Sequence, residues 1–377
     1  MWEKISIDSL REAGSVKWST FPQTIGMFIA EMDLGIPPVV SEVISGQLGR
    51  GALGYLPAPV AEAAKEATAH LMASQFSWEV PASRVHLVPD VLSALRQTIA
   101  HLSTGPVVVP TPAYMPFLEV PLQCGAEIRE VPSLVREGRY ELDMAGIDAA
   151  LADGGLLLLC NPWNPVGRVL ERDELAAVEE IVTRRGAKVF ADEIHCPLVL
   201  DGTHIPYASL SAATAEHTVT ALAASKGWNI PGLKCAQMIL GPADTEAFAP
   251  WAKPAADPVG ILGPLAAAAV YRDDRGWRDK VLMVLRADRD ITTERLAGIE
   301  LLAGTRPEGT YISWIDASAL AKRVGNPAEY LRAHGVALTD GSLSGRGYEN
   351  HLRLVFASTP DILHEAFDRI QDACAKA

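Results

Sequence analysis

One lysine in this chain lies where its side chain could do covalent chemistry. The apolar run 219–223 ends in a turn of small residues, and the turn places Lys226 where a buried strand would stop. Apolar surroundings disfavour the ammonium form of a lysine, and the neutral amine can attack a carbonyl carbon to form a Schiff base. The alternative is a solvated loop lysine, because the serine, glycine and asparagine near Lys226 are common loop residues.

Three other polar residues lie next to apolar runs. Asn164 and Asp192 each follow such a run, and Arg353 lies between two leucines. If the runs are parallel strands, their carboxyl ends meet at one edge of a sheet, where ligands bind. Taken singly, Asn164 could belong to a turn, Asp192 could open a helix, and Arg353 could have a structural partner.

A pyridoxal 5′-phosphate site requires this combination of groups. The cofactor needs an amine at its C4′, an anion that keeps its pyridine nitrogen protonated, donors to its O3′, and cationic or backbone donors to its phosphate. An α-amino acid substrate adds the need for an arginine that binds its carboxylate. A single cofactor therefore explains Lys226, Asp192, Asn164 and Arg353 together.

These residues belong to motifs that resemble those of the fold-type I, aspartate aminotransferase-like enzymes, which use pyridoxal 5′-phosphate. The closest branch is that of the cystathionine β-lyases and C–S lyases of the MalY/PatB type. The resemblance is carried by residues 161–169 (NPWNPVGRV), 191–195 (ADEIH), 225–235 (SKGWNIPGLKC), and Arg353 ahead of 357–360 (ASTP). Further matching segments are 17–18 (KW), 30–33 (AEMD), 111–114 (TPAY) and 307–311 (PEGTY), so the likeness covers nearly the whole chain.

The resemblance implies a role for each site residue. Lys226 would form the Schiff base and then move the substrate Cα proton, Asp192 would pair with the pyridine nitrogen, and Arg353 would bind the substrate carboxylate. The other cofactor-binding residues would be Asn164 and His195 near O3′, Tyr114 stacked on the ring, Ser225, and, at the phosphate, the backbone amides of Val91 and Leu92, Lys234, and the partner subunit's Tyr55. For His195 and Tyr114, the alternative is ordinary core packing. No metal is expected.

Two positions depart from the family's pattern. Trp163 stands where the family usually has a histidine, and its position beside Asn164 could alter the fit of the substrate. Ala223 stands where the family usually has a serine, which removes a hydroxyl expected at the phosphate. Binding of the cofactor would then depend more on Lys234 and on the backbone amides.

The resemblance implies a carbon–sulfur β-lyase. The expected reaction is α,β-elimination on L-cystathionine or another cysteine S-conjugate, giving a thiol, pyruvate and ammonia. An aminotransferase is the first alternative, because it shares every residue named above. A regulatory binding protein that retains the fold is the second, although the presence of Lys226 argues against it. Enzymes of the family build each active site from two subunits, so the resemblance also implies a homodimer.

The elements that would position these residues alternate along the chain. Short apolar runs are predicted as strands at 85–88, 107–109, 128–131, 156–160, 189–191, 219–223 and 237–240. Helices are predicted between or before them at 60–76, 93–102, 144–151 and 171–185. Buried strands that alternate with helices indicate an α/β fold with a mostly parallel sheet covered on both faces. With the family resemblance, the prediction is a seven-stranded sheet of the fold-type I class.

The C-terminal third has a different pattern, which predicts a second, smaller α+β domain. A helical segment at 265–297, interrupted at Gly276, precedes predicted strands at 311–315, 335–338 and 352–355 and predicted helices at 327–334 and 360–375. We predict a large domain at 45–265 that binds the cofactor, and a small domain formed by 1–44 and 266–377.

Composition limits the class of protein and its partners. The 377 residues, 49% of them hydrophobic, are enough for two domains with a substantial core. A net charge of −13 argues against nucleic acid or an anionic membrane as a partner. Five scattered cysteines form no disulfide framework, and neither a leader segment at the N-terminus nor a membrane span is evident. These features predict a cytoplasmic protein.

Overall fold

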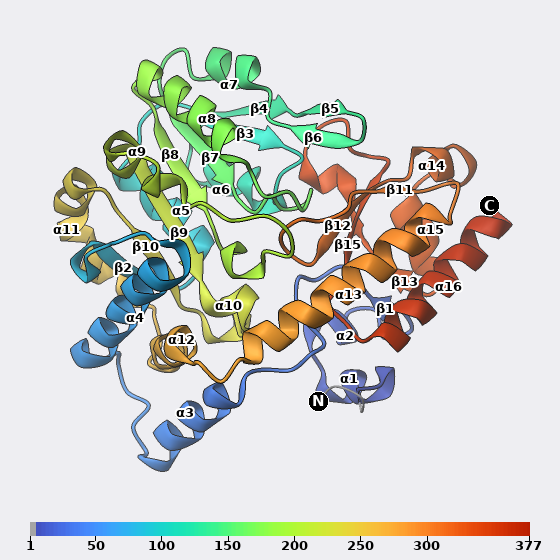
Figure 1. Cartoon of the computed structure of the whole chain (residues 1–377), viewed down its shortest axis with the longest axis horizontal. Coiled ribbons are helices and arrows are strands. Elements are labelled where there is room, and N and C mark those ends of the chain that lie inside the picture. Colours follow the sequence, from blue (N-terminus) through green and yellow to red (C-terminus); the bar gives the residue numbers. More distant parts are fainter. Residues whose placement is uncertain (1–4) are drawn as a thin grey trace.

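A seven-stranded sheet forms the centre of the protein in the computed structural model, which describes residues 5–377 (Figure 1). The first four residues, on which the expectation of no leader segment partly rests, lie outside this range. The strand order is β2 (Val85–Val88), β10 (Ala236–Ile239), β9 (Thr218–Ala223), β8 (Lys188–Asp192), β7 (Leu156–Cys160), β3 (Val107–Thr111) and β4 (Ile128–Pro132). All seven strands predicted from the apolar runs are therefore present.

The sheet is parallel except at one strand. The pairs β3–β4, β3–β7, β7–β8 and β8–β9 are parallel, whereas β10 runs antiparallel to both β9 and β2. The carboxyl ends of β7, β8 and β9 therefore lie side by side at one edge of the sheet. This arrangement confirms the predicted mostly parallel α/β sheet and is the one expected for the fold-type I class.

Alternate side chains of the central strands enter separate cores on the two faces of the sheet. In β7, Leu156 and Leu158 pack in one cluster, whereas Leu157 and Leu159 pack in the other. The first face is covered by α5 (Val91–His101) and α11 (Pro242–Ala256). The second is covered by α7 (Met144–Ala150) and α8 (Arg172–Arg185) over β7 and β8, and by α4 (Ala58–Phe76) near β2. Because both faces are buried, these strands read as continuous apolar runs.

Two consecutive helices lead from the large sheet into the C-terminal region. The predicted interruption at Gly276 separates α12 (Leu262–Arg272) from α13 (Trp277–Ala297), and Gly276 has a left-handed φ of 73° that favours glycine. Helix α12 packs on α4 and α3 (Pro38–Gly49), and α13 crosses the molecule to reach α16 (Pro360–Lys376) (Figure 1).

The C-terminal region is built on a four-stranded antiparallel sheet. Its order is β11 (Ala303–Gly304), β12 (Ile312–Asp316), β15 (His351–Val355) and β14 (Thr339–Asp340), and it is flanked by α14 (Ser318–Val324), α15 (Pro327–Ala333) and α16. The strand predicted at 335–338 is present as β13 (Val336–Ala337), but it pairs with β1 (Ile25–Gly26) and not with the four-stranded sheet. The next two residues form β14, which pairs with β15.

The predicted domain limits stay a prediction. The limit at 44/45 falls within the continuous helix α3, and the limit at 265/266 falls within α12. Apart from short 3-10 helices, the remaining elements are α1 (Ile7–Ala13), α2 (Val16–Ser19), β5 (Leu134–Arg136), β6 (Arg139–Glu141), α6 (Val120–Gln123), α9 (Ala212–His217) and α10 (Ala224–Gly227).

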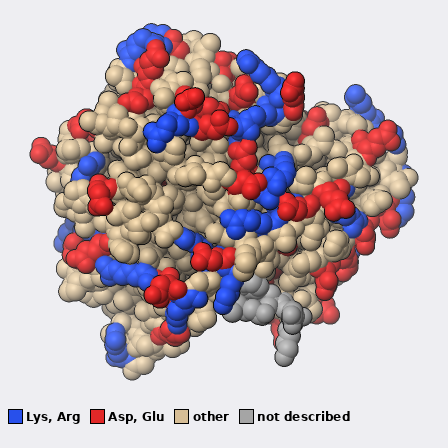
Figure 2. Space-filling view, in the orientation of Figure 1, with Lys and Arg blue, Asp and Glu red and all other residues tan. Residues whose placement is uncertain are grey.

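Charged side chains of both signs are interspersed over the face shown in Figure 2. Among the described residues, many charged side chains form ion pairs, such as Arg184 with Glu180 and Arg275 with Glu42. Across residues 5–377, no helix combines the length and the apolar character needed to cross a lipid bilayer.

Close packing at Gly263 gives a test of the fold. Alanine is the better helix former, yet a Cβ at Gly263 in α12 would lie 2.4 Å from the Leu233 carbonyl oxygen. We expect Gly263→Ala to destabilise the protein by about 2 kcal/mol in chemical denaturation, because the turn that carries Lys234 must shift. The matched control is Gly46→Ala in α3, where a Cβ would meet nothing within 4 Å, and we expect it to be neutral or stabilising. Equal effects of the two substitutions would contradict this packing.

Candidate active site

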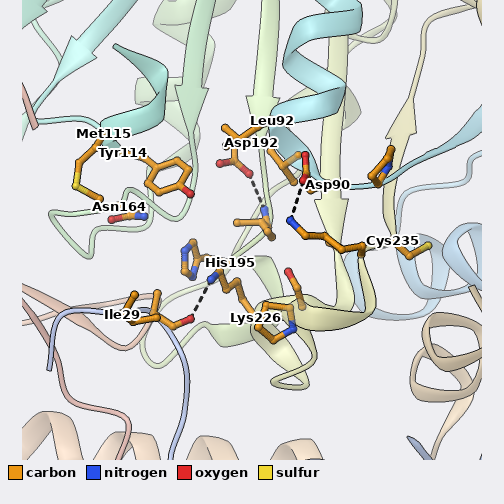
Figure 3. A pocket seen from close by; sticks show the side chains of 18 of the residues that line it. Ile29, Asp90, Leu92, Tyr114, Met115, Asn164, Asp192, His195, Lys226 and Cys235 are labelled. Carbon is orange, nitrogen blue, oxygen red and sulfur yellow. Dashed lines mark hydrogen bonds and ion pairs between the residues drawn. The ribbon is translucent and has the colours of Figure 1, made fainter. Parts of the chain in front are cut away.

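A cavity of about 300 Å³ opens at the carboxyl ends of β7, β8 and β9 (Figure 3). In the sheet, Cys160 at the end of β7 is paired with Asp192 at the end of β8, and Asp192 is paired with Ala221 of β9. Short connections after these strand ends bring Asn164, His195 and Lys226 to the cavity wall. The prediction that groups after separate strands would meet at one edge of the sheet is therefore confirmed.

Lys226 projects into the cavity from the short helix α10, three residues after β9 ends. Its Nζ donates a hydrogen bond to the Ala30 carbonyl oxygen at 2.9 Å (Figure 3). Burial, and after it the positive charge of Arg353, lower the pKa of the lysine to about 8, although Glu31 and Asp192 act in the opposite direction. A substantial fraction of neutral amine is therefore present at mildly alkaline pH, as nucleophilic or basic chemistry requires.

Asp192 faces the cavity with little compensation for its charge. Its side chain is 3% exposed, and its Oδ1 accepts one hydrogen bond from the Ile194 backbone N–H at 3.1 Å. Burial raises the pKa of this carboxyl to about 7, and the neighbouring Glu193 contributes to the increase. The Glu193 side chain has other partners: it accepts a hydrogen bond from the Tyr207 backbone N–H and contacts the His204 ring. A cationic ring N–H would supply the partner that Asp192 lacks.

Helix α5 begins at another wall of the cavity. The Asp90 side chain caps the helix by accepting from the Ser93 backbone N–H at 2.8 Å, and the Ala94 N–H bonds to the Asp90 carbonyl oxygen. The amides of Val91 and Leu92 thus precede the capped turn, at the end of the helix that favours anions. Lys234 lies beside them, and its Nζ forms an ion pair with Asp90 Oδ2 at 3.0 Å.

Arg353 reaches the cavity from β15 of the C-terminal sheet and is 5% exposed. Its Nη2 donates to the Phe28 carbonyl oxygen at 2.8 Å, and its Nη1 to Asn164 Oδ1 at 3.5 Å. Its Nε has no acceptor among residues 5–377. A guanidinium with spare donors in a buried wall is suited to bind a carboxylate.

Aromatic groups complete the lining of the cavity. His195 is buried, and burial together with the charge of Lys226 lowers its pKa to about 3, so the ring is neutral. Its Nδ1 has no partner in the described part of the chain, and its ring lies edge-on to Tyr311. Tyr114 also lines the cavity, and burial raises its pKa.

The structure brings together ten of the eleven predicted site residues. These are Lys226, Asp192, Asn164, His195, Tyr114, Val91, Leu92, Lys234, Ser225 and Arg353. Tyr55 does not line the cavity of its own chain and is 98% exposed. Its role, like the individual roles of the other ten residues, stays a prediction.

Sequence reasoning missed several residues that form the cavity wall. Ile29 and Ala30 come from the N-terminal segment. Asp90 directly precedes α5, and Met115 begins a short 3-10 helix. The AEMD motif that begins at Ala30 could have indicated that this segment belongs to the site. Its residue types do not indicate that a backbone carbonyl would contact Lys226.

The two departures from the family's pattern have different surroundings. Trp163 is buried, and its Nε1 donates to the Pro112 carbonyl oxygen at 2.9 Å, so it connects the loop that carries Asn164 to the loop that carries Tyr114. Ala223 lines the cavity directly. A methyl group at that position provides no donor to a bound anion.

These residues fit pyridoxal 5′-phosphate. The cavity combines an amine, a desolvated carboxylate that forms no ion pair within residues 5–377, an aromatic side chain, and a helix N-terminus beside a lysine. Each group matches one requirement of the cofactor: C4′, the pyridine nitrogen, the ring face and the phosphate.

Comparison with known proteins agrees with this geometry. The model of the aminotransferase class I and II family matches residues 23–370. The cystathionine β-lyase of Corynebacterium glutamicum is 32% identical, over 97% of this chain and 98% of its own length. The chain belongs to the aminotransferase class I and II family.

Two solved structures extend the likeness to three dimensions. A putative pyridoxal phosphate-dependent β-cystathionase from Corynebacterium diphtheriae has a TM-score of 0.93 and 31% identity, covering 100% of this chain and 99% of that one. Cystalysin from Treponema denticola, whose structure contains pyridoxal 5′-phosphate, has a TM-score of 0.92 and 25% identity, with the same coverage.

The raised pKa of Asp192 predicts that this carboxylate lowers the stability of the cofactor-free fold while it strengthens binding of the cofactor. The folded carboxyl has a pKa near 7, above its unfolded value, so the cost of burying its charge is absent below about pH 4 and complete above pH 7. We expect cofactor-free Asp192→Asn to be more stable than wild type at pH 8, by on the order of 4 kcal/mol, and this difference should vanish near pH 4.

The same variant should bind the cofactor more weakly, because an amide does not stabilise a protonated pyridine nitrogen. Chemical denaturation at the two pH values and cofactor titration of the two proteins measure the two effects. A stability difference that does not depend on pH would contradict the assignment.

Proposed function

We propose that this chain is a pyridoxal 5′-phosphate-dependent carbon–sulfur β-lyase that acts on L-cystathionine or another cysteine S-conjugate. The observation that carries the proposal is the meeting of Lys226, Asp192 and Arg353 around one cavity, from α10, β8 and β15. The family match and the relatives named above confirm the predicted family branch and the cofactor. The products are a thiol, pyruvate and ammonia.

The residues of the cavity divide the work of binding. The Arg353 guanidinium binds the substrate carboxylate, and Asn164, which contacts Arg353, fixes the orientation of the guanidinium. The amides of Val91 and Leu92, together with Lys234, hold the phosphate, and Tyr114 covers the ring. Asp192 stays ionised against the ring nitrogen once the charge of that nitrogen offsets the cost of burial.

The proton chemistry depends on Lys226. When bound, the cofactor supplies an electron sink that makes the Cα proton of the substrate acidic. The neutral Nζ of Lys226 takes that proton, and its lowered pKa allows it to do so near neutral pH. The electron pair left on Cα forms a double bond to Cβ, and the Cβ–S bond breaks to release the thiolate. Hydrolysis of the released enamine then gives pyruvate and ammonia.

We further propose a cytoplasmic homodimer. Tyr55 extends from the chain after α3, with 98% of its surface exposed, although it is a large aromatic residue. Leu48 and Leu53 nearby are more than half exposed. An exposed apolar segment of this kind supports contact with a second copy, to whose site Tyr55 would contribute.

The first test of the proposed function is an assay with L-cystathionine. We expect the yellow, cofactor-loaded protein to produce pyruvate and free thiol in equal amounts, and Lys226→Ala to lose at least about 10³-fold in rate. A yellow protein that makes neither product, but turns over amino acids when a keto acid is supplied, would be an aminotransferase. A protein that binds no pyridoxal phosphate would overturn the enzymatic proposal and support a binding role.

The second test concerns Arg353. Lysine retains the charge but cannot form the planar pair of hydrogen bonds with a carboxylate. We expect Arg353→Lys to lower kcat/KM by about 10²-fold, mainly through a higher KM, because the lost contact binds substrate before and during reaction. The control is Arg306→Lys, whose guanidinium forms surface ion pairs with Asp201 and Asp290. An unchanged KM in the Arg353 variant would argue against carboxylate binding.

A further inference from the structure

One segment of the N-terminal arm, residues 28–35, contacts three parts of the active site through its backbone. We call this segment the strap. The Phe28 carbonyl oxygen accepts from Arg353 at 2.8 Å, and the Ala30 carbonyl oxygen accepts from Lys226 at 2.9 Å. Beyond them, the Met32 backbone exchanges two hydrogen bonds with the Asn229 side chain, which follows Lys226 in the same turn. Figure 3 shows the bond from Lys226 reaching the strap beside Ile29.

The strap is fixed by a buried cluster outside the cavity. Asp33 accepts from Lys17 Nζ at 2.8 Å through Oδ2 and from Trp18 Nε1 at 2.7 Å through Oδ1. The side chains of Lys17 and Asp33 are 1% and 3% exposed. Lys17 Nζ also donates to the Glu31 carbonyl oxygen at 3.3 Å, and the Asp33 backbone N–H bonds to the Ala357 carbonyl oxygen. A buried ion pair of this kind is held in one geometry, because either charge alone would be strongly destabilised.

A second donor shares the Ala30 carbonyl oxygen with Lys226. The Tyr311 hydroxyl donates to the Ala30 carbonyl oxygen at 3.0 Å and is fully buried beside His195. The position of the Ala30 oxygen therefore decides how strongly the ammonium form of Lys226 is held. That position depends on where Asp33 anchors the strap.

We propose that Asp33, held by Lys17 and Trp18, is a positioning residue for Lys226, and that it acts through the Ala30 carbonyl of the strap. The inference rests on the proposed function, because it takes Lys226 as the amine that binds the cofactor. None of the three cluster residues lines the cavity. Their effect on the lysine is transmitted by the backbone between Ala30 and Asp33.

The charges that face Lys226 determine the direction of the expected effect. Arg353 and Lys234 favour the neutral amine, whereas Asp192 and Glu31 favour the ammonium form. Glu31 belongs to the strap, as does the Ala30 carbonyl that accepts from Nζ. A loosened strap would thus remove two features that stabilise the ammonium form, and the pKa of Lys226 should fall.

The experiment measures how the capture of pyridoxal phosphate depends on pH. The full-length chain is freed of cofactor and mixed with pyridoxal phosphate, and the rate at which the visible band appears is followed. Only the neutral amine reacts, so the rate rises with pH through the pKa of Lys226, and the cofactor's own ionisation affects all variants alike. Circular dichroism and thermal melting check that each variant is folded.

Two variants weaken the anchor formed by Asp33, Lys17 and Trp18. Neither variant leaves a buried charge without its partner. In Lys17→Met/Asp33→Asn both charges are removed, and we expect the midpoint of the profile to fall by about one pH unit, the value of one hydrogen bond to a charged group. In Trp18→Phe one donor to Asp33 is removed, and we expect a smaller fall. Tyr311→Phe removes the second donor, and we expect its midpoint to rise.

The control breaks a partly buried ion pair at the opposite end of β8 from the cavity. Asp244, which is 5% exposed, pairs with Lys188 at the start of β8, whereas Asp192 and the cavity lie at the end of that strand. We expect Asp244→Asn to lower the melting temperature and leave the midpoint of capture unchanged.

Three results would overturn the inference. They are unchanged midpoints in both folded anchor variants, an equal fall in Asp244→Asn, and a fall in Tyr311→Phe of the same size as in the anchor variants. A wild-type chain that never develops the visible band would be a different failure. It would overturn the proposed function, and the inference about the strap with it.

Discussion

The structure depends on the desolvation of two ionisable groups of opposite sign at adjacent strand ends. Burial lowers the pKa of Lys226 to about 8 and raises that of Asp192 to about 7, so each group resists ionisation in the chain alone. Such groups are costly in a protein interior, and they persist at sites where their reactivity is used. A cofactor that brings a carbonyl carbon for the amine and a ring cation for the carboxylate relieves both costs at once.

The rest of the fold serves to bring partners to this pair. The parallel order of β7, β8 and β9 places Asn164, Asp192 and Lys226 at one edge. The C-terminal sheet contributes Arg353 through β15, and the N-terminal arm contributes the strap, which contacts both Arg353 and Lys226. Residues more than 300 positions apart in the chain thus share one cavity, and the pairing of β1 with β13 joins the N-terminal arm to the C-terminal region.

Most of the fold could be predicted because burial on both faces leaves a simple pattern. Continuous apolar runs such as 156–160 predicted the strands, and the interruption at Gly276 was visible as a glycine in a helical pattern. The switch from one sheet to another between β13 and β14 could not be predicted, since strands of two residues have no periodicity. The core of the site was predicted from residue types after strand ends, and the roles of its residues came from family resemblance.

The strap was missed because its contribution is a backbone carbonyl, which no side chain reveals. The pairing of Lys234 with Asp90 was missed because it joins residues 144 positions apart.

We infer that Lys226, and no other lysine, is the amine that bonds to pyridoxal 5′-phosphate. To test this, the protein is loaded with cofactor and reduced with borohydride so that the bond becomes permanent, and the modified lysine is located by peptide mass spectrometry. We expect one modified site, at Lys226. Modification at Lys234 or at another lysine, or a protein that carries no modification after reduction, would contradict it.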